Sequence, residues 1–231
     1  MVISGLQKLT LLDYPGKVAC TVFTAGCNFR CPFCHNASLV LPGRSVQQLD
    51  ENFLFSFLEK RRGVLDGVAV TGGEPLLHKE LPALLRRIKD MGFAVKLDTN
   101  GSFPERLEGI IGDGLADRVA MDIKSSPSDY GRVTGLEGFD ISAVERSKDL
   151  LLSGGVDYEF RTTVVKGLHT AGSLREAARW IAGAKEYYLQ QYKDSGDVIT
   201  SDGLSAFSEK EMQCLADAVR PHVPGVQLRG V

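Results

Sequence analysis

The sequence predicts an α/β fold with a parallel sheet, arranged as an incomplete, laterally open (βα)6 TIM-like barrel. Three observations support this fold class. Short apolar runs alternate with helical patterns along the chain, each βα unit spans about 30 residues, and the 231 residues fall short of the roughly 250 of a complete eight-fold barrel. A doubly wound open sheet is the alternative, but no G-x-G-x-x-G motif follows the first strand to favour a dinucleotide site.

Six strands are expected, each a short run of β-branched and other apolar residues. They span residues 18–24, 67–71, 94–98, 118–123, 158–165 and 185–190, and residues 225–229 are a candidate short terminal strand. Helical patterns cover residues 46–62, 79–91, 104–111, 142–153, 173–182 and 208–219. Ser45 is the expected cap of the first helix, and residues 6–16 form an apolar stretch closed by a Pro-Gly turn.

The composition is that of an ordinary globular protein, with 43% hydrophobic and 24% charged residues and a net charge of -2. This balance argues against a nucleic-acid binder that relies on a broad basic surface. Neither a long apolar run nor a secretory signal pattern is present, so we expect a cytoplasmic protein without a membrane partner. A single domain over residues 1–231 is expected, because this length can bury one hydrophobic core.

The strongest chemical signal is a group of three cysteines directly after the first predicted strand. Cys27, Cys31 and Cys34 form a C-x3-C-x2-C pattern. A cubane 4Fe-4S cluster usually takes four thiolates, so three leave one iron open to bind a small molecule. The alternatives are three unrelated thiols, or a zinc site completed by His35 or Cys214, although structural zinc usually draws its ligands from two spaced pairs. Outside such a site, Cys214 is interpreted as a small buried hydrophobic residue.

Polar residues follow the other predicted strands at the edge that carries function in parallel α/β folds. They are Gly72-Gly73-Glu74-Pro75, Asp98-Thr99-Asn100-Gly101, Asp122-Ile123-Lys124, Arg161 and Gln190-Gln191. The two glycines make a tight turn or let a ligand approach the backbone. Asp98 and Asp122 would be costly at the ends of buried strands unless paired or used. Lys124 and Arg161 either neutralise them or hold a ligand carboxylate.

Taken together, these motifs resemble the radical S-adenosylmethionine (SAM) superfamily over about residues 13–191. The resemblance rests on the three cysteines with Phe33 before the last one, followed by Gly72-Gly73-Glu74-Pro75. Cys34-His35-Asn36, the 97–101 segment and Asp122-x-Lys124 are similar to the activating enzymes of glycyl radical proteins. The lead-in L-T-L-L-D-Y-P-G-K at residues 9–17 is most like the activating proteins of anaerobic ribonucleoside-triphosphate reductase. Many relatives have D-G-P-G-x-R where this chain has D-Y-P-G-K-V, which bears on the protein substrate.

The resemblance implies an enzyme that uses a 4Fe-4S cluster and SAM. Cys27, Cys31 and Cys34 would bind the cluster, and SAM would occupy the open iron. One-electron reduction would then release a 5′-deoxyadenosyl radical that takes a hydrogen atom from a glycine of the partner. No side chain need act as a general base. The implied partners are that glycyl radical enzyme, taken to be anaerobic ribonucleotide reductase, and a flavodoxin-like or ferredoxin-like electron donor.

The resemblance also implies which residues would contact SAM. Gly72, Gly73 and Glu74 would contact the methionine amino group, largely through backbone, and Phe33 would lie against the adenine. The methionine carboxylate and its surroundings would involve Asp98, Thr99, Asn100, Asp122, Lys124 and Arg161, with a monovalent cation as a candidate addition. Gln191 falls where some relatives place a histidine near the ribose. The alternatives are an enzyme acting on a small molecule such as a pterin-type ring, an activator of another glycyl radical enzyme such as pyruvate formate-lyase, and a non-catalytic iron-sulfur or zinc protein.

Overall fold

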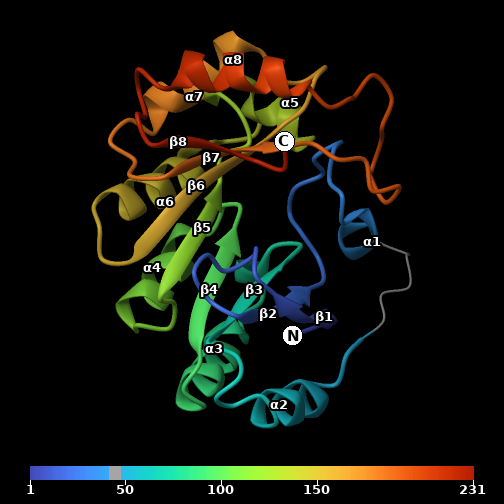
Figure 1. The fold of residues 1–231 in the computed structure, drawn as a ribbon, viewed down its shortest axis with the longest axis vertical. Helices are drawn as coiled ribbons and strands as arrows, with labels where there is room; N and C mark the ends of the chain where they lie inside the picture. Colours follow the sequence, from blue (N-terminus) through green and yellow to red (C-terminus); the bar gives the residue numbers. More distant parts are fainter. Residues whose placement is uncertain (42–47) are drawn as a thin grey trace.

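The computed structural model describes residues 1–41 and 48–231. It contains one eight-stranded sheet in which the strands follow one another in chain order (Figure 1). The first pair, β1 (Ile3–Thr10) and β2 (Ala19–Thr24), is antiparallel, and every later pair is parallel. Within the described ranges, no ladder joins β1 to the last strand, β8 (Val226–Arg229). The sheet is therefore open along one side, and the predicted incomplete barrel is confirmed.

The six predicted strands all form, and each begins and ends within two residues of its predicted bounds. After β2 they are β3 (Gly67–Gly72), β4 (Ala94–Thr99), β5 (Arg118–Asp122), β6 (Asp157–Val164) and β7 (Tyr187–Gln191). The candidate terminal strand is also present, as β8. The prediction missed β1, whose pairing with β2 is interrupted by irregularities after Ile3 and after Gln7. Such bulges break the two-residue alternation by which a strand is recognised in a sequence.

The longer helices cover the outside of the curved sheet (Figure 1). The helices of the described residues are α1 (Ala37–Val40), α2 (Glu51–Glu59), α3 (Leu81–Asp90), α4 (Pro104–Gly112), α5 (Tyr130–Thr134), α6 (Ser142–Leu152), α7 (Ala171–Trp180) and α8 (Glu209–Val219). The prediction missed the short α1 and α5. It also started α2 too early, because the cap is Asp50, whose side chain accepts a hydrogen bond from the Asn52 backbone. The predicted cap, Ser45, lies outside the described residues.

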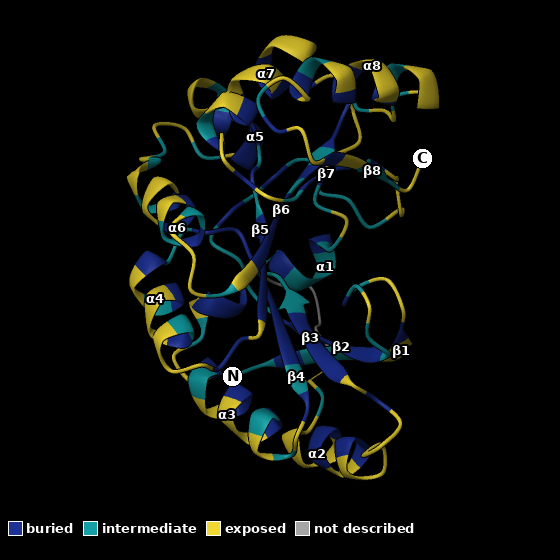
Figure 2. Cartoon of the chain, turned by 60° about the vertical axis from the view of Figure 1, so that its left-hand side comes forward, coloured by how far each residue is buried: buried dark blue, intermediate teal, exposed yellow. Residues whose placement is uncertain are grey.

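Apolar side chains fill the space between the sheet and the helices. The helices are buried on the side that faces the sheet and exposed on the other (Figure 2). In α3, for example, Leu84, Leu85 and Ile88 are buried, and they recur at the spacing of one helical face. No helix in the described part of the chain is long and apolar enough to cross a membrane.

Candidate active site

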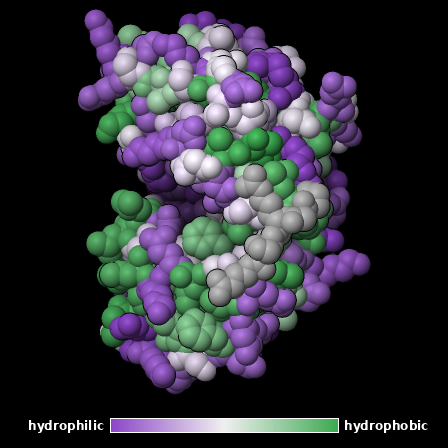
Figure 3. Space-filling model, turned by 90° about the vertical axis from the view of Figure 1, so that its right-hand side faces the viewer, coloured by the Kyte–Doolittle hydropathy of each residue, from purple (hydrophilic) through white to green (hydrophobic). Residues whose placement is uncertain are grey.

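A cavity of about 460 Å³ lies at the carboxyl ends of the parallel strands. Its lining includes most of the residues that the sequence singled out, namely Cys27, Cys31, Phe33, Cys34, Gly72, Gly73, Asp98, Thr99, Asn100, Asp122, Lys124 and Arg161. Seen from the side in Figure 3, the molecule is indented between its upper and lower parts, and both hydrophilic and hydrophobic side chains border the indentation. Residues from at least five strand ends therefore meet around one space large enough for a small-molecule ligand.

The three cysteines occupy a loop between β2 and α1 that its own backbone and its neighbours hold in shape. The Arg30 backbone donates to Thr134 O (2.8 Å), and Cys34 N donates to Cys31 O (3.0 Å). The backbone N–H of Phe29 lies 3.3 Å from Cys27 Sγ, and Asn100 Nδ2 lies 3.8 Å from the same sulfur. Such N–H groups stabilise a negatively charged sulfur, so the loop is suited to a thiolate at Cys27.

The thiols lie in surroundings that disfavour free thiolates. Burial raises the pKa of Cys27 to about 11 and that of Cys31 to about 12, and it also raises the pKa of Cys34. A bound metal reverses this preference, because metal binding takes the proton from the thiol. The thiols of the buried Cys31 and the half-buried Cys27 and Cys34 line one cavity. They are a soft donor set of the kind that iron-sulfur clusters use, and the donor chemistry therefore fits a cluster.

The arrangement of the ligands bears on the zinc alternative. Among the described residues, no three His, Cys, Asp or Glu side chains are grouped closely enough to hold one metal ion. Mononuclear zinc draws its sulfur ligands to about 2.3 Å from a single centre, whereas a cubane cluster distributes its thiolates over separate irons. Cys214 is exposed on α8 and is not part of the cavity lining. The prediction that Cys214 is buried was wrong, because it lies on the solvent side of an amphipathic helix.

Gly72 and Gly73 allow the end of β3 to pack directly on the backbone that leads into the cysteine loop. A Cβ at Gly72, where φ is +123°, would lie 2.3 Å from the backbone N and O of Thr24. A Cβ at Gly73 would lie 1.9 Å from Gly26 O. Gly73 N and Glu74 N donate to Thr24 O (2.9 Å) and Gly26 O (2.8 Å). Close backbone packing thus explains both glycines, which also line the cavity.

The Glu74 side chain is fully buried, and Glu74 is not among the residues that line the cavity. Its carboxylate accepts hydrogen bonds from Leu76 N (3.0 Å), Thr99 Oγ1 (2.8 Å) and Asn100 N (2.6 Å). Burial raises the pKa of Glu74 to about 7, against the opposing effect of these hydrogen bonds. Glu74 therefore ties the turn after β3 to the end of β4.

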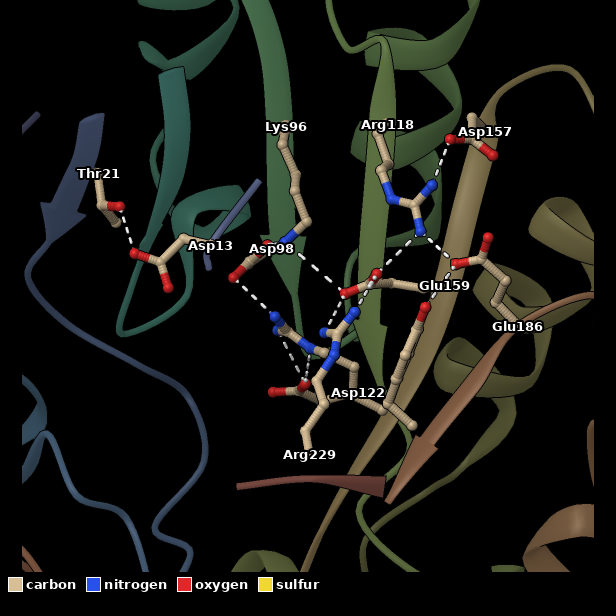
Figure 4. Close-up of polar contacts among 12 residues, drawn as sticks. Asp13, Thr21, Lys96, Asp98, Arg118, Asp122, Asp157, Glu159, Glu186 and Arg229 are labelled. Atoms are coloured by element: carbon tan, nitrogen blue, oxygen red, sulfur yellow. Dashed lines mark hydrogen bonds and ion pairs between the residues drawn. The ribbon is translucent and has the colours of Figure 1, made fainter. Parts of the chain in front are cut away.

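Asp98, Asp122, Lys124 and Arg161 form one continuous charge network (Figure 4 labels both aspartates). Arg161 bridges the two carboxylates, with Nη1 3.0 Å from Asp98 Oδ2 and Nε 3.0 Å from Asp122 Oδ1. Lys124 Nζ lies 2.8 Å from Asp122 Oδ2. Burial opposes ionisation of Asp122, but Arg161 and Lys124 outweigh it and hold the pKa of Asp122 well below its usual range. Lys124 and Arg161 thus pair with the two aspartates and neutralise their charge. This is one of the two roles that the sequence left open for them.

A second layer of buried charges, which the sequence analysis missed, supports this network. Lys96 is 1% exposed, and its Nζ lies 2.6 Å from Asp98 Oδ1 and 3.9 Å from Glu159 Oε1. Glu159 is fully buried and pairs with Arg118 at 2.9 Å and with Arg229 at 2.9 Å (Figure 4). The sequence does contain a signal for this layer, because several of the apolar strands carry one charged residue each. A charge buried in a strand needs a partner, so such residues indicate buried ion pairs.

Gln191, for which the resemblance implies a ribose contact, is not among the residues that line the cavity. Its Nε2 donates to Phe207 O (2.5 Å), and Gln190 lines the cavity instead. Neighbouring residues of a strand face opposite sides of a sheet, so a shift of one residue along β7 decides which of the two glutamine side chains faces the cavity. The sequence analysis also missed His169, which is buried, has Nε2 2.8 Å from Lys124 O and contacts the Phe33 ring edge-on.

Comparison with known proteins identifies the class of this site. The model of the Radical SAM superfamily matches residues 21–181, and the chain belongs to that superfamily. Cluster and SAM binding are the chemistry that this family membership implies.

Individual proteins and one solved structure resemble this chain over different shares of its length. The chain is 31% identical over 240 residues to a candidate glycyl-radical enzyme activating enzyme of Methanocaldococcus jannaschii, covering 99% of this chain and 96% of that protein. It is 33% identical over 175 residues to a candidate GTP 3′,8-cyclase of Halobacterium salinarum, covering 72% of this chain but only 47% of the cyclase. A crystallised domain of pyruvate-formate lyase-activating enzyme from Bacteroides vulgatus shares the fold, with a TM-score of 0.58 at 18% identity over 71% of this chain and 99% of that domain.

Proposed function

We propose that this chain is a radical SAM activating enzyme that generates a glycyl radical on a partner enzyme, with anaerobic ribonucleoside-triphosphate reductase as that partner. One observation carries the proposal: a single cavity joins the three-cysteine loop to the glycine turn of β3 and to the charged ends of β4, β5 and β6. The nearly full-length likeness to a candidate activating enzyme supports the same activity. The lead-in segment at residues 9–17 supports the choice of partner.

In this proposal Cys27, Cys31 and Cys34 hold a 4Fe-4S cluster. A bound, reduced cluster would supply the one electron needed to split SAM into methionine and a 5′-deoxyadenosyl radical, and that radical would take a hydrogen atom from a partner glycine and leave as 5′-deoxyadenosine. Phe33 provides an apolar surface for the adenine. The strand-end backbone at Gly72, Gly73 and Glu74 is left for the methionine amino group.

The charged residues orient the methionine carboxylate. Lys124 Nζ has three N–H donors, and among the described residues its recorded acceptor is Asp122. It can therefore donate to a ligand carboxylate while it keeps that bond. Thr99 and Asn100 complete the lining beside Asp98. A monovalent cation is not required for charge balance here, because Lys96, Lys124 and Arg161 already pair with the carboxylates.

We further propose that the chain acts as one domain over residues 1–231 in the cytoplasm, with a flavodoxin-like or ferredoxin-like protein as electron donor. All five cysteines are free thiols in the structure, and a reducing compartment keeps such thiols available for iron. An open lateral side of the barrel suits this activity, because a glycine on a protein loop must reach the cavity.

The test is anaerobic reconstitution with iron and sulfide, followed by SAM, a reductant and the partner reductase. We expect 4Fe-4S absorbance, release of 5′-deoxyadenosine, and a glycyl radical doublet in the electron paramagnetic resonance spectrum that requires the partner. Cys31→Ala is the matched control and should give none of these signals. A protein that binds cluster and cleaves SAM but gives no doublet with a competent reductase would refute the partner assignment. A colourless protein that binds zinc would refute the whole proposal.

The likeness to a candidate GTP 3′,8-cyclase favours a second function, a radical SAM reaction on a small nucleotide. The chain spans less than half of that protein, so this activity would have to be complete within the matched part. Incubation of the reconstituted protein with GTP, and separately with pyruvate formate-lyase, distinguishes the candidates. A GTP-derived product without any partner protein supports the second function, whereas a radical on the lyase supports another activating enzyme.

A further inference from the structure

The segment from Asp194 to Thr200, between β7 and α8, lies against the cysteine loop. Thr200 N donates to Pro32 O (3.0 Å), between the second and third cysteines. Ala37 N, just after the third cysteine, donates to Asp197 O (3.1 Å). The cysteine loop is thus hydrogen-bonded on both sides of Cys34 to a part of the chain that follows it by about 160 residues and lies beyond the 21–181 range of the superfamily match.

The Asp197 side chain makes the most specific of these contacts. Its Oδ2 accepts hydrogen bonds from both the backbone N (3.0 Å) and the hydroxyl Oγ (2.6 Å) of Ser38. With the Ala37 bond to its carbonyl, Asp197 holds two consecutive residues at the end of the cysteine loop. Hydrogen bonds to a carboxylate are shorter and stronger than those between neutral groups, so this contact fixes the point at which the loop enters α1.

A second element holds the opposite part of the same loop. The Arg30 backbone donates to Thr134 O at the end of α5 (2.8 Å), and Gly135 leaves no room for a Cβ against Arg30 O. Cys31 and Cys34 therefore lie between two anchors, Arg30 held by α5 and residues 37–38 held by the 194–200 segment. Ligand loops that must be ordered upon metal binding lose affinity to conformational entropy, and anchors on both sides of these two cysteines remove much of that loss.

We propose that Asp197 is a positioning residue that keeps the cysteine loop in its cluster-binding conformation. This inference rests on the proposed function, because it requires Cys27, Cys31 and Cys34 to be the cluster ligands. Asp197 is not among the residues that line the cavity; it acts through Ser38 and Ala37 on the backbone that follows Cys34. Residues that orient metal ligands in this way typically contribute 10- to 100-fold to metal affinity.

The experiment compares Asp197→Ala, Asp197→Asn and Ser38→Ala with the wild type. Asp202→Asn, an exposed aspartate in the same connecting segment, is the matched control. Each protein is reconstituted anaerobically, and iron and sulfide content, the rate of cluster loss to a chelator, and the electron paramagnetic resonance spectrum of the reduced cluster with and without SAM are measured. We expect Asp197→Ala to lose its cluster about tenfold faster or more, with an altered spectrum.

Asparagine keeps an acceptor for Ser38, so Asp197→Asn should recover most of the wild-type retention. Ser38→Ala removes only the hydroxyl bond and should have a smaller effect than Asp197→Ala. Thermal unfolding of the apo-proteins checks that the fold is intact. If Asp197→Ala does not fold, the test rests on the cluster retention of Asp197→Asn and Ser38→Ala. Retention in Ser38→Ala equal to that of the wild type would then overturn the inference. Equal cluster retention in Asp197→Ala, Asp202→Asn and the wild type would overturn the inference. A wild type that takes up no cluster would instead overturn the proposed function.

Discussion

Replacement of Glu74 by glutamine should change how the stability of the protein depends on pH. Glu74 is fully buried and its carboxylate accepts three hydrogen bonds, two of them from backbone N–H groups. Its pKa is raised from the ordinary 4.5 to about 7, chiefly by burial. Glutamine has nearly the same shape but does not titrate, so Glu74→Gln removes this one proton-binding equilibrium. Its amide has one acceptor oxygen where the carboxylate has two, so the variant also loses hydrogen bonding at every pH, and only the pH dependence reports on the titration.

The sign and size of the effect follow from linkage between proton binding and folding. A carboxyl group whose pKa is higher in the folded state favours folding when it is protonated, so its contribution is fully present below pH 4.5 and is lost as the pH rises through about 7. The full difference between the folded and the ordinary pKa of Glu74 corresponds to about 3 kcal/mol of unfolding free energy. Between pH 5 and pH 8 the wild type should therefore lose about 2 to 3 kcal/mol of unfolding free energy relative to Glu74→Gln.

The assay is urea denaturation of the anaerobic apo-proteins at a series of pH values, followed by circular dichroism. The difference between wild type and variant is the quantity of interest, because the titration of all other groups largely cancels in it. Glu108→Gln, on the exposed face of α4, controls for the substitution itself. A wild-type minus Glu74→Gln difference that stays flat from pH 5 to pH 8, or that grows with pH, would refute the reasoning.

The remaining predictions concern the ligands, the glycine turn and the buried charges. Alanine at Cys27, Cys31 or Cys34 should abolish cluster iron and SAM cleavage. Alanine at Cys214, which is exposed, should leave both unchanged. Equal losses from all four would contradict the ligand assignment. Gly73→Ala should destabilise the apo-protein by about 3 kcal/mol or more, because its Cβ would overlap backbone, while Gly109→Ala in α4, where the space is open, should stabilise it by about 0.5–1 kcal/mol in denaturant unfolding. Glu159→Gln should cost about 3 kcal/mol in the same measurement, because it removes the charge of a fully buried carboxylate that pairs with Arg118 and Arg229, while Arg118 keeps its pairs with Asp157 and Glu186; a loss below about 1 kcal/mol would show that these charges rearrange.

The sequence predicted the strand order and most of the residues that line the cavity. The reason is that both signals are local. An apolar run of five to eight residues marks a buried parallel strand, and a polar residue just after it is placed at the carboxyl edge by the fold class alone. Asp98 and Asp122 were located in this way without any knowledge of their partners, and the cysteine loop was located by spacing within a single stretch of chain.

Other features depended on contacts that no local pattern specifies. The β1 strand was missed because its pairing contains bulges. Gln191 was named from the resemblance alone, and only the structure shows that Gln190 lines the cavity while Gln191 bonds to Phe207 O. The buried partners Lys96 and Glu159 lie on different strands, so only the assembled sheet brings them together.

The sequence by itself determined that this chain folds as an open α/β barrel and carries three cysteines and a set of charged residues at one edge. The tertiary structure decided how those groups are held. In the folded chain Asp98 pairs with Arg161, and Asp122 pairs with Lys124. The Glu74 carboxylate is hydrogen-bonded to the end of β4, and Asp197 is hydrogen-bonded to Ser38 beside the cysteine loop. The physical reason is that spacing along the chain encodes local geometry, whereas hydrogen bonds between distant segments form only when the whole core has packed.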